Sequence, residues 1–141
     1  RALDTSPVYM SGELVMGEGI RASGVPREEL WLSTKIDSVL RPPHLSPKAF
    51  ALESLRKSME RLGVSYLDIA YLHWGPMQAA LQGESLSAED YVEMWRGLLE
   101  AKRAGLVRTL GVCESSRSDI ESLIRLTGEA PAVALAWFNP W

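Results

Sequence analysis

Apolar residues fall along the chain in short continuous runs that alternate with stretches of helical spacing. The short runs predict strands at residues 2–3, 30–35, 67–73, 107–113 and 132–138, the first of them closed by Asp4. Between them, recurring apolar positions and N-cap signals predict helices over residues 12–23, 47–62, about 88–104 and 116–126. Segments 38–44 and 73–87 are rich in Pro, Gly, Gln and Ser, and are expected to be loops. The predicted order is therefore strand and helix in strict alternation.

Such alternation predicts βαβ units and a parallel sheet. About five parallel strands form either an open, doubly wound sheet or part of a (β/α)8 barrel. Two features favour the barrel, since no Gly-rich phosphate fingerprint follows the first strand and polar or charged residues end several successive strands. We expect an α/β protein of the TIM-barrel class, here an incomplete barrel in a single domain spanning residues 1–141.

Composition narrows the class of protein further. The chain has 141 residues, of which 46% are hydrophobic and 23% charged, as in globular proteins that bury a core. A net charge of −3 without a Lys/Arg cluster gives no sign of a nucleic-acid or membrane partner, and no apolar run reaches the length of a membrane span. The lone Cys113 rules out an internal disulfide and fits a reducing cytoplasm, so a cytoplasmic location is predicted. Because the chain lacks an initiator Met and ends directly after an apolar segment, both ends are expected to be cut.

Four side chains at or just beyond the strand ends suggest chemistry. Parallel strands would bring Asp4, Tyr9, Lys35 and His73 to one edge of the sheet. A tyrosine is a weak acid with a reference pKa of about 10, and a nearby ammonium favours its phenolate. Lys35 could supply that ammonium, Asp4 could hold it, and His73 could donate a hydrogen bond to a carbonyl oxygen. Taken singly, each residue has a plainer structural interpretation as a turn, core or surface side chain, but the set predicts carbonyl reduction.

Several motifs resemble the aldo-keto reductases over nearly the whole chain. They are Asp4-Thr5-Ser6-x-x-Tyr9 with Gly12-Glu13, Ser33-Thr34-Lys35, Ser54-Leu55-x-x-Ser58-x-x-x-Leu62-Gly63, Asp68, Leu72-His73-Trp74, and Gly105-x-Val107-Arg108-x-x-Gly111-Val112. The resemblance implies a (β/α)8 barrel that reduces a small aldehyde or ketone with NADPH, or sometimes NADH. It places the family's catalytic tetrad on Asp4, Tyr9, Lys35 and His73, and an aromatic wall of the substrate pocket on Trp74.

The chain also departs from the family pattern. Cys113 and Glu114 stand where the family usually holds the nicotinamide carboxamide with a Ser-Asn pair, and Leu135 replaces a common Gln. An Asn amide both donates and accepts hydrogen bonds, whereas an ionised Glu only accepts. Without the resemblance, Cys113 is interpreted as a small buried thiol. Glu114 is interpreted as a strand-end carboxylate facing water or as a new acid or base.

The resemblance runs from the family's second barrel strand to its sixth, so the loops that bind the cofactor's phosphates lie outside it. We therefore expect a fragment or truncated relative, whose open sheet edges would favour self-association. One alternative is a catalytically impaired relative that acts as a binding or subunit-contact module. Another is an open-sheet enzyme of unrelated chemistry. The aromatic residues Trp137, Phe138 and Trp141 are either a pocket wall or the end of a strand.

Overall fold

The strands form one parallel sheet in which their spatial order is the same as their order in the chain. They are β1 (Ala2–Asp4), β2 (Trp31–Ile36), β3 (Leu67–Leu72), β4 (Val107–Cys113) and β5 (Val133–Leu135). The computed structural model describes residues 1–137. A doubly wound sheet reverses its strand order at a switch point, whereas a (β/α)8 barrel adds strands in sequence. The order β1-β2-β3-β4-β5 is therefore that of half a barrel, which confirms the predicted fold class and excludes the open-sheet alternative.

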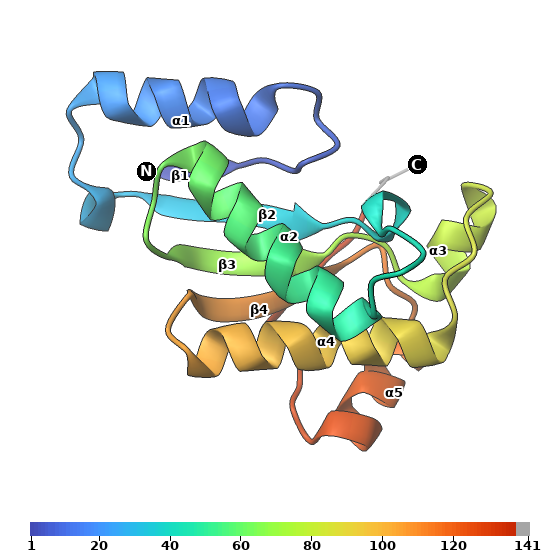
Figure 1. The fold of residues 1–141 in the computed structure, drawn as a ribbon. Coiled ribbons are helices and arrows are strands. Elements are labelled where there is room, and N and C mark those ends of the chain that lie inside the picture. The colour runs from blue at the N-terminus through green and yellow to red at the C-terminus, as the bar shows by residue number, and fades with distance from the viewer. Residues whose placement is uncertain (138–141) are drawn as a thin grey trace.

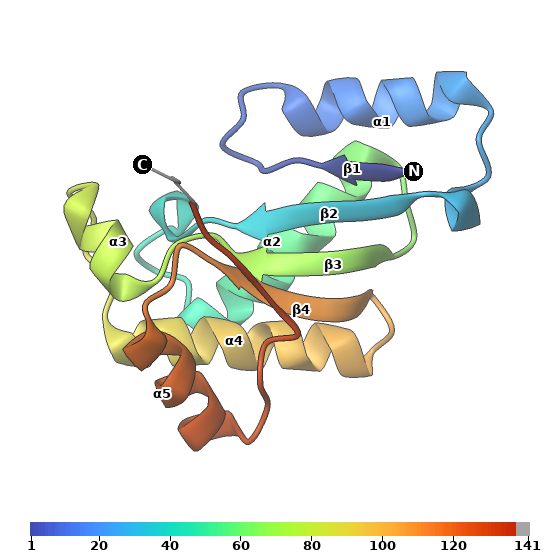
Figure 2. The same cartoon turned by 180° about the vertical axis from the view of Figure 1, so that it is seen from behind.

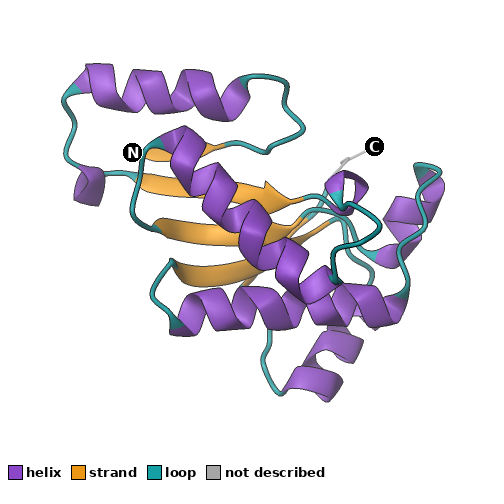
Figure 3. Cartoon of the chain, in the orientation of Figure 1, coloured by secondary structure: helices purple, strands orange, loops and turns teal. Residues whose placement is uncertain are grey.

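Helices join the successive strands and lie mainly on one face of the sheet. They are α1 (Gly12–Ser23), α2 (Pro47–Leu62), α3 (Pro76–Leu81), α4 (Ala88–Arg103) and α5 (Arg117–Thr127), with 3-10 turns at Arg27–Glu29 and Ser38–Leu40. α2 and α4 lie in front of the sheet (Figures 1 and 3), and the opposite face, seen from behind, carries no helix over β2 and β3 and is crossed by the segment that includes β5 (Figure 2). That open face corresponds to the inside of a barrel.

The sequence sets the helix ends and their packing. The Ser46 side chain accepts the Ala49 N–H at 3.3 Å and caps α2, with proline as the first helical residue. Gly63, with φ 71°, ends the same helix in a left-handed conformation. Gly97 lets α4 approach α2 closely, since a Cβ there would lie 2.5 Å from the carbonyl oxygen of Lys48.

Side chains alternate between the two faces of each strand, as the period of a strand requires. One set packs under the helices in the main core, and it includes Leu32, Ile36, Ala70, Leu72, Leu110 and Val112. On the open face Lys35 pairs in register with Tyr71, which forms a small buried cluster with Ile69 and Cys113. Gly111 leaves room there for the Tyr71 ring, because a Cβ would lie 2.6 Å from it.

Charged groups tie together the amino-terminal ends of the strands. The buried carboxylate of Asp68 accepts from Arg27 at 2.7 Å, from Arg108 at 3.0 Å and from the Leu32 N–H at 2.9 Å. Both guanidinium groups also lie over the Tyr66 ring, 4.0 and 4.3 Å from its centroid. This network closes the end of the sheet that lies opposite the candidate site.

Most predicted elements are confirmed, with differences at boundaries and in loops. β2 runs one residue later than predicted, and the expected loop 38–44 begins with a 3-10 turn. The expected loop 73–87 contains α3, which begins with a proline directly after Gly75. β5 covers only three residues of the predicted 132–138, and Phe138 and Trp141 lie outside the described residues. Among residues 1–137, no helix is both long enough and apolar enough to cross a membrane.

Candidate active site

The four tetrad positions line one cleft at the carboxyl ends of the strands. Asp4 ends β1, Tyr9 lies in the loop after it, Lys35 belongs to β2, and His73 directly follows β3. The cleft has a volume of about 560 Å³, and its other walls are Gln78, Cys113, Glu114, Leu135 and Trp137. The predicted convergence at one edge of the sheet is therefore observed.

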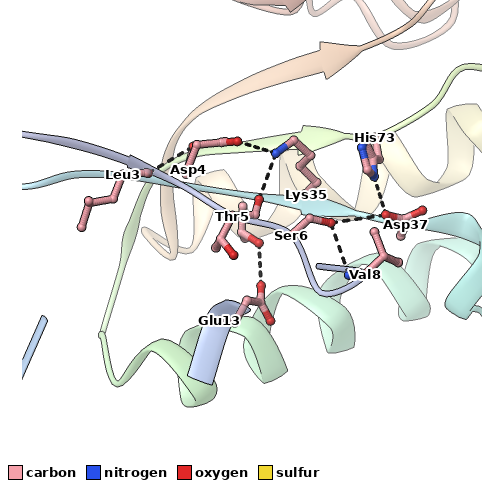
Figure 4. A network of polar contacts seen from close by, with 11 residues as sticks. Leu3, Asp4, Thr5, Ser6, Val8, Glu13, Lys35, Asp37 and His73 are labelled. Carbon is pink, nitrogen blue, oxygen red and sulfur yellow. Dashed lines mark hydrogen bonds and ion pairs between the residues drawn. The ribbon is translucent and has the colours of Figure 1, made fainter. Parts of the chain in front are cut away.

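Lys35 is fixed in the floor of this cleft by a carboxylate and a carbonyl oxygen. Its Nζ donates to Asp4 Oδ2 at 2.6 Å and to the Thr5 carbonyl oxygen at 3.0 Å, although only 2% of the residue is exposed (Figure 4). Ser33 donates from Oγ to the other oxygen of Asp4 at 2.5 Å, which orients that carboxylate. Burial by itself lowers the pKa of Lys35, but the hydrogen bond and charge of Asp4, aided by Tyr9, raise this pKa above its ordinary value. The side chain is thus a cation at neutral pH.

Tyr9 extends over this cation. The Lys35 Nζ lies 4.8 Å from the centroid of the phenol ring, and the ring stands edge-on to the His73 ring with centroids 6.1 Å apart. About 46% of Tyr9 is exposed, so the phenol is accessible from the cleft and from solvent. Its loop is held by backbone hydrogen bonds from the Tyr9 N–H to the Ser6 carbonyl oxygen at 3.1 Å and from the Gly12 N–H to the Tyr9 carbonyl oxygen at 2.8 Å.

The helix that follows Tyr9 is anchored by a buried carboxylate. Glu13, in the first turn of α1, accepts from Thr34 Oγ1 at 2.6 Å and from Arg61 Nε at 2.6 Å. These bonds join α1 to β2 and to α2. Because Thr34 precedes Lys35 in β2, the anchor also fixes the position of the Tyr9 loop relative to the lysine.

His73 is held by its backbone and by its ring. Its N–H donates to the Ile36 carbonyl oxygen at 3.0 Å, and its Nδ1 contacts the carboxylate of Asp37 (Figure 4). Sequence reasoning missed Asp37, which is fully buried. The sequence did contain a signal for Asp37. Residues two positions apart in a strand share one face, so a carboxylate two positions after Lys35 lies on the same face as the lysine, at the same edge of the sheet.

Trp74 occupies a different place from the one expected for a pocket wall. Its ring lies beside that of His73, with centroids 5.1 Å apart, and the side chain packs against the main core. Among the described residues, the walls of the cleft do not include Trp74 but do include Trp137, which is 90% exposed. The substrate contact expected of Trp74 therefore stays a prediction. Gln78 of α3 is a further wall that the sequence did not reveal.

The three residues predicted to replace cofactor contacts, Cys113, Glu114 and Leu135, also face the cleft. Glu114 has φ 47° and accepts the Trp137 N–H on its Oε1 at 2.6 Å, so this carboxylate is joined to the last described residue. Burial, followed by the charge of Glu114, raises the pKa of the Cys113 thiol to about 11, which keeps it protonated at neutral pH. Leu135 contributes an apolar side chain.

Together these groups suit proton delivery. The cleft holds a fixed cation, an accessible phenol beside it and an imidazole whose ring faces the phenol. A cation next to a phenol stabilises the phenolate left when the phenol gives up its proton. Among residues 1–137, no group of three or more His, Cys, Asp or Glu side chains is arranged to hold a metal ion.

Comparison with known proteins gives one consistent result. The family model described as "Aldo/keto reductase family" matches residues 1–141. An aldo-keto reductase of Mycolicibacterium smegmatis is 36% identical over 140 residues, which cover 99% of this chain and 44% of that protein. The 2,5-diketo-D-gluconic acid reductase B of a Corynebacterium species is 34% identical over 141 residues, which cover 100% of this chain and 46% of that protein.

Solved structures agree with the sequence comparison. The crystal structure of a Bombyx mori aldo-keto reductase in complex with NADP is similar with a TM-score of 0.79 and 29% identity, over 99% of this chain and 44% of that one. The chain thus spans less than half the length of the relatives that it matches.

Proposed function

The chain belongs to the aldo/keto reductase family, and we propose that it carries the proton-delivery site of an NADPH-dependent reduction of a small aldehyde or ketone to an alcohol. The acid is Tyr9, the cation that assists it is Lys35, and Asp4 holds that cation in place. His73 positions the carbonyl oxygen. NADH is the alternative donor.

The bound nicotinamide would supply a hydride to the carbonyl carbon. As negative charge grows on the carbonyl oxygen, His73 donates a hydrogen bond to it and Tyr9 transfers its phenolic proton to it. The phenolate that remains is stabilised by the Lys35 ammonium, and the exposed Tyr9 regains a proton from solvent. Hydride on carbon and proton on oxygen together make the alcohol.

The observation that carries this proposal is the fixation of Lys35. An ammonium that is 98% buried is costly unless it is paired and hydrogen-bonded. Here it has two oxygen partners, and it lies beneath the ring of an exposed phenol. A purely structural ion pair would not need to be placed under the accessible Tyr9 inside a cleft.

The cleft suits a nicotinamide ring in size and partly in polarity. Cavities that bind small molecules have volumes of roughly 300–1,000 Å³, and this one is about 560 Å³. Glu114 would accept a hydrogen bond from the carboxamide N–H₂, while Cys113 offers only a weak donor and Leu135 none. These residues would hold one side of the carboxamide, so we expect weaker cofactor binding than a Ser-Asn pair would give.

The test is to replace Tyr9 by Phe, which keeps the ring and removes the phenolic proton. Turnover of small aldehydes, ketones and dicarbonyls, followed by NADPH absorbance, should fall about a hundredfold or more. NADPH affinity, followed by its fluorescence, should stay the same. The matched control is Tyr66→Phe, at the opposite end of the sheet, which should retain turnover. Unchanged turnover in Tyr9→Phe would rule out the proposed acid.

A second candidate function is a binding or subunit-contact module without catalysis. The observation that favours it is the bond between the Glu114 carboxylate and the Trp137 N–H, which occupies part of the group expected to face the carboxamide. Titration of NADPH into the protein distinguishes the two. A saturable change in NADPH fluorescence supports the reductase, and no change at millimolar protein and cofactor supports the module.

A further inference from the structure

Asp37 is a buried carboxylate at the candidate site that the proposed reaction does not use. It follows β2 directly, none of its surface is exposed, and one of its oxygens, Oδ2, contacts Nδ1 of His73. Ser6 donates to the same oxygen from Oγ at a long 3.4 Å. Its other oxygen, Oδ1, has no hydrogen-bond partner among the described residues.

Such an arrangement needs an energetic explanation. A fully buried carboxylate with one unpartnered oxygen is costly unless a positive charge or strong donor compensates it. Ser6 is too distant to do so alone. The only other side chain that hydrogen-bonds to the carboxylate among the described residues is His73. The imidazole ring is therefore the group available to balance Asp37.

The contact between Asp37 and His73 limits the protonation states that the His73 ring can adopt. A carboxylate oxygen and a ring nitrogen approach each other only with a proton between them. If Asp37 is ionised, that proton is on Nδ1, and Nε2 is the nitrogen left for the cleft. Nε2 can then donate to a carbonyl oxygen only if the ring carries both protons and a positive charge.

We propose that Asp37 is a positioning residue that holds His73 through Nδ1 and favours its doubly protonated ring, so that Nε2 presents a charged hydrogen-bond donor to the substrate oxygen. This role in reduction rests on the proposed function, whereas the pairing of Asp37 with His73 does not. A charged donor stabilises developing negative charge more strongly than a neutral imidazole. No proton leaves His73 in the step, because Tyr9 supplies it.

Other charged and titratable groups also face the His73 ring. Those on the cleft walls or against the ring are Asp4, Tyr9, Lys35, Cys113 and Glu114. Lys35 opposes a second positive charge, but its own charge is already matched by Asp4. Cys113 stays protonated at neutral pH because burial raises its pKa to about 11. Asp37 is therefore the acidic group in direct contact with the ring.

The test is nitrogen-15 NMR of the histidine rings in the 141-residue chain. Its two histidines are His73 and the exposed His44, which serves as an internal reference. At neutral pH we expect Nδ1 of His73 to be protonated, with a substantial share of rings that carry both protons. A neutral ring would overturn the proposal in either form. If its one proton is on Nε2, the shared proton belongs to Asp37, and if it is on Nδ1, Nε2 has no proton to donate.

Asp37→Asn removes the charge with little change in shape. The share of doubly protonated His73 rings should fall at neutral pH, while the share for His44 stays constant. An unchanged His73 share in the folded variant would refute the pairing. If the variant fails to fold, the protonation of both ring nitrogens of His73 in the unaltered chain decides the question by itself.

Kinetics separate this inference from the proposed function. Asp37→Asn should lower kcat with a smaller effect on KM, and Asp37→Glu should restore part of kcat. If Tyr9→Phe abolishes turnover but His73 is neutral with its proton on Nε2, the reductase stands and the inference fails. If His73 behaves as expected but Tyr9→Phe retains turnover, the reductase fails and the pairing stands.

Discussion

Replacing Asp4 by Asn tests how strongly the buried ammonium depends on its partner. The substitution retains the shape and the contact with Ser33, but it removes the charge 2.6 Å from Lys35 Nζ. Breaking a fully buried ion pair costs about 3–5 kcal/mol, whereas exposed pairs contribute about 0.2–1 kcal/mol. Lys35 is buried but the Asp4 side chain is 50% exposed, so solvent screens part of the interaction. We expect a loss of about 2 kcal/mol, or roughly a thirtyfold change in the unfolding constant.

The pH dependence of this loss follows from the raised pKa of Lys35. A group whose pKa is higher in the folded than in the unfolded chain stabilises the fold below its unfolded pKa, and this contribution is lost as pH rises through the folded pKa. For Lys35 the ordinary value is 10.5, so the contribution is complete at neutral pH and lost only in strongly alkaline solution. The difference in stability between the two chains should therefore shrink above that pH.

The assay is urea unfolding of both chains at neutral pH and at several alkaline pH values. A matched control is Glu53→Gln, which removes the exposed ion pair with Lys57 at 2.6 Å and should leave the free energy of unfolding nearly unchanged, because solvent screens that pair. Two results would refute the reasoning. One is a loss in Asp4→Asn no larger than that in the control, and the other is a loss that stays constant through the alkaline range.

Three further outcomes are expected. In α1, Gly17→Ala should destabilise the fold by about 1–3 kcal/mol, because the added Cβ would lie 2.4 Å from a backbone oxygen of α2. In the same helix, the Cβ added by Gly19→Ala would meet nothing within 4 Å, so this substitution should stabilise the fold by about 0.5–1 kcal/mol. Chemical denaturation measures both changes, and equal effects would contradict the packing of α1 on α2. Asp68→Asn should cost about 3 kcal/mol or more by the same measurement, since it removes the negative charge between two arginines and one of the two oxygens that accept hydrogen bonds there. A loss below about 1 kcal/mol would show that this network is dispensable. Cys113 should resist alkylation at neutral pH and react fully once urea unfolds the chain, because burial raises the pKa of its thiol to about 11. Mass spectrometry measures the labelling, and rapid labelling of the folded protein would contradict this expectation.

Local signals in the chain predicted the elements well. Apolar runs, N-cap residues and glycine stops placed the main helices and strands, because these depend on side-chain burial and on backbone conformation within a few residues. The short α3 was missed, since a single helical turn and a half has too few apolar positions to show a period. β5 was predicted too long, because a continuous apolar run does not indicate at which residue its hydrogen bonding to the neighbouring strand β4 ends.

By itself the sequence determined that strands and helices alternate and that Asp4, Tyr9, Lys35 and His73 lie at or just beyond strand ends, because these are properties of short segments. Only the tertiary structure decided which strands are neighbours and which side chains meet. The bond from Lys35 to Asp4 spans 31 positions in the chain and the contact of His73 with Asp37 spans 36. Such contacts form because the strands add to the sheet in sequence, and this register brings their carboxyl ends around one cleft.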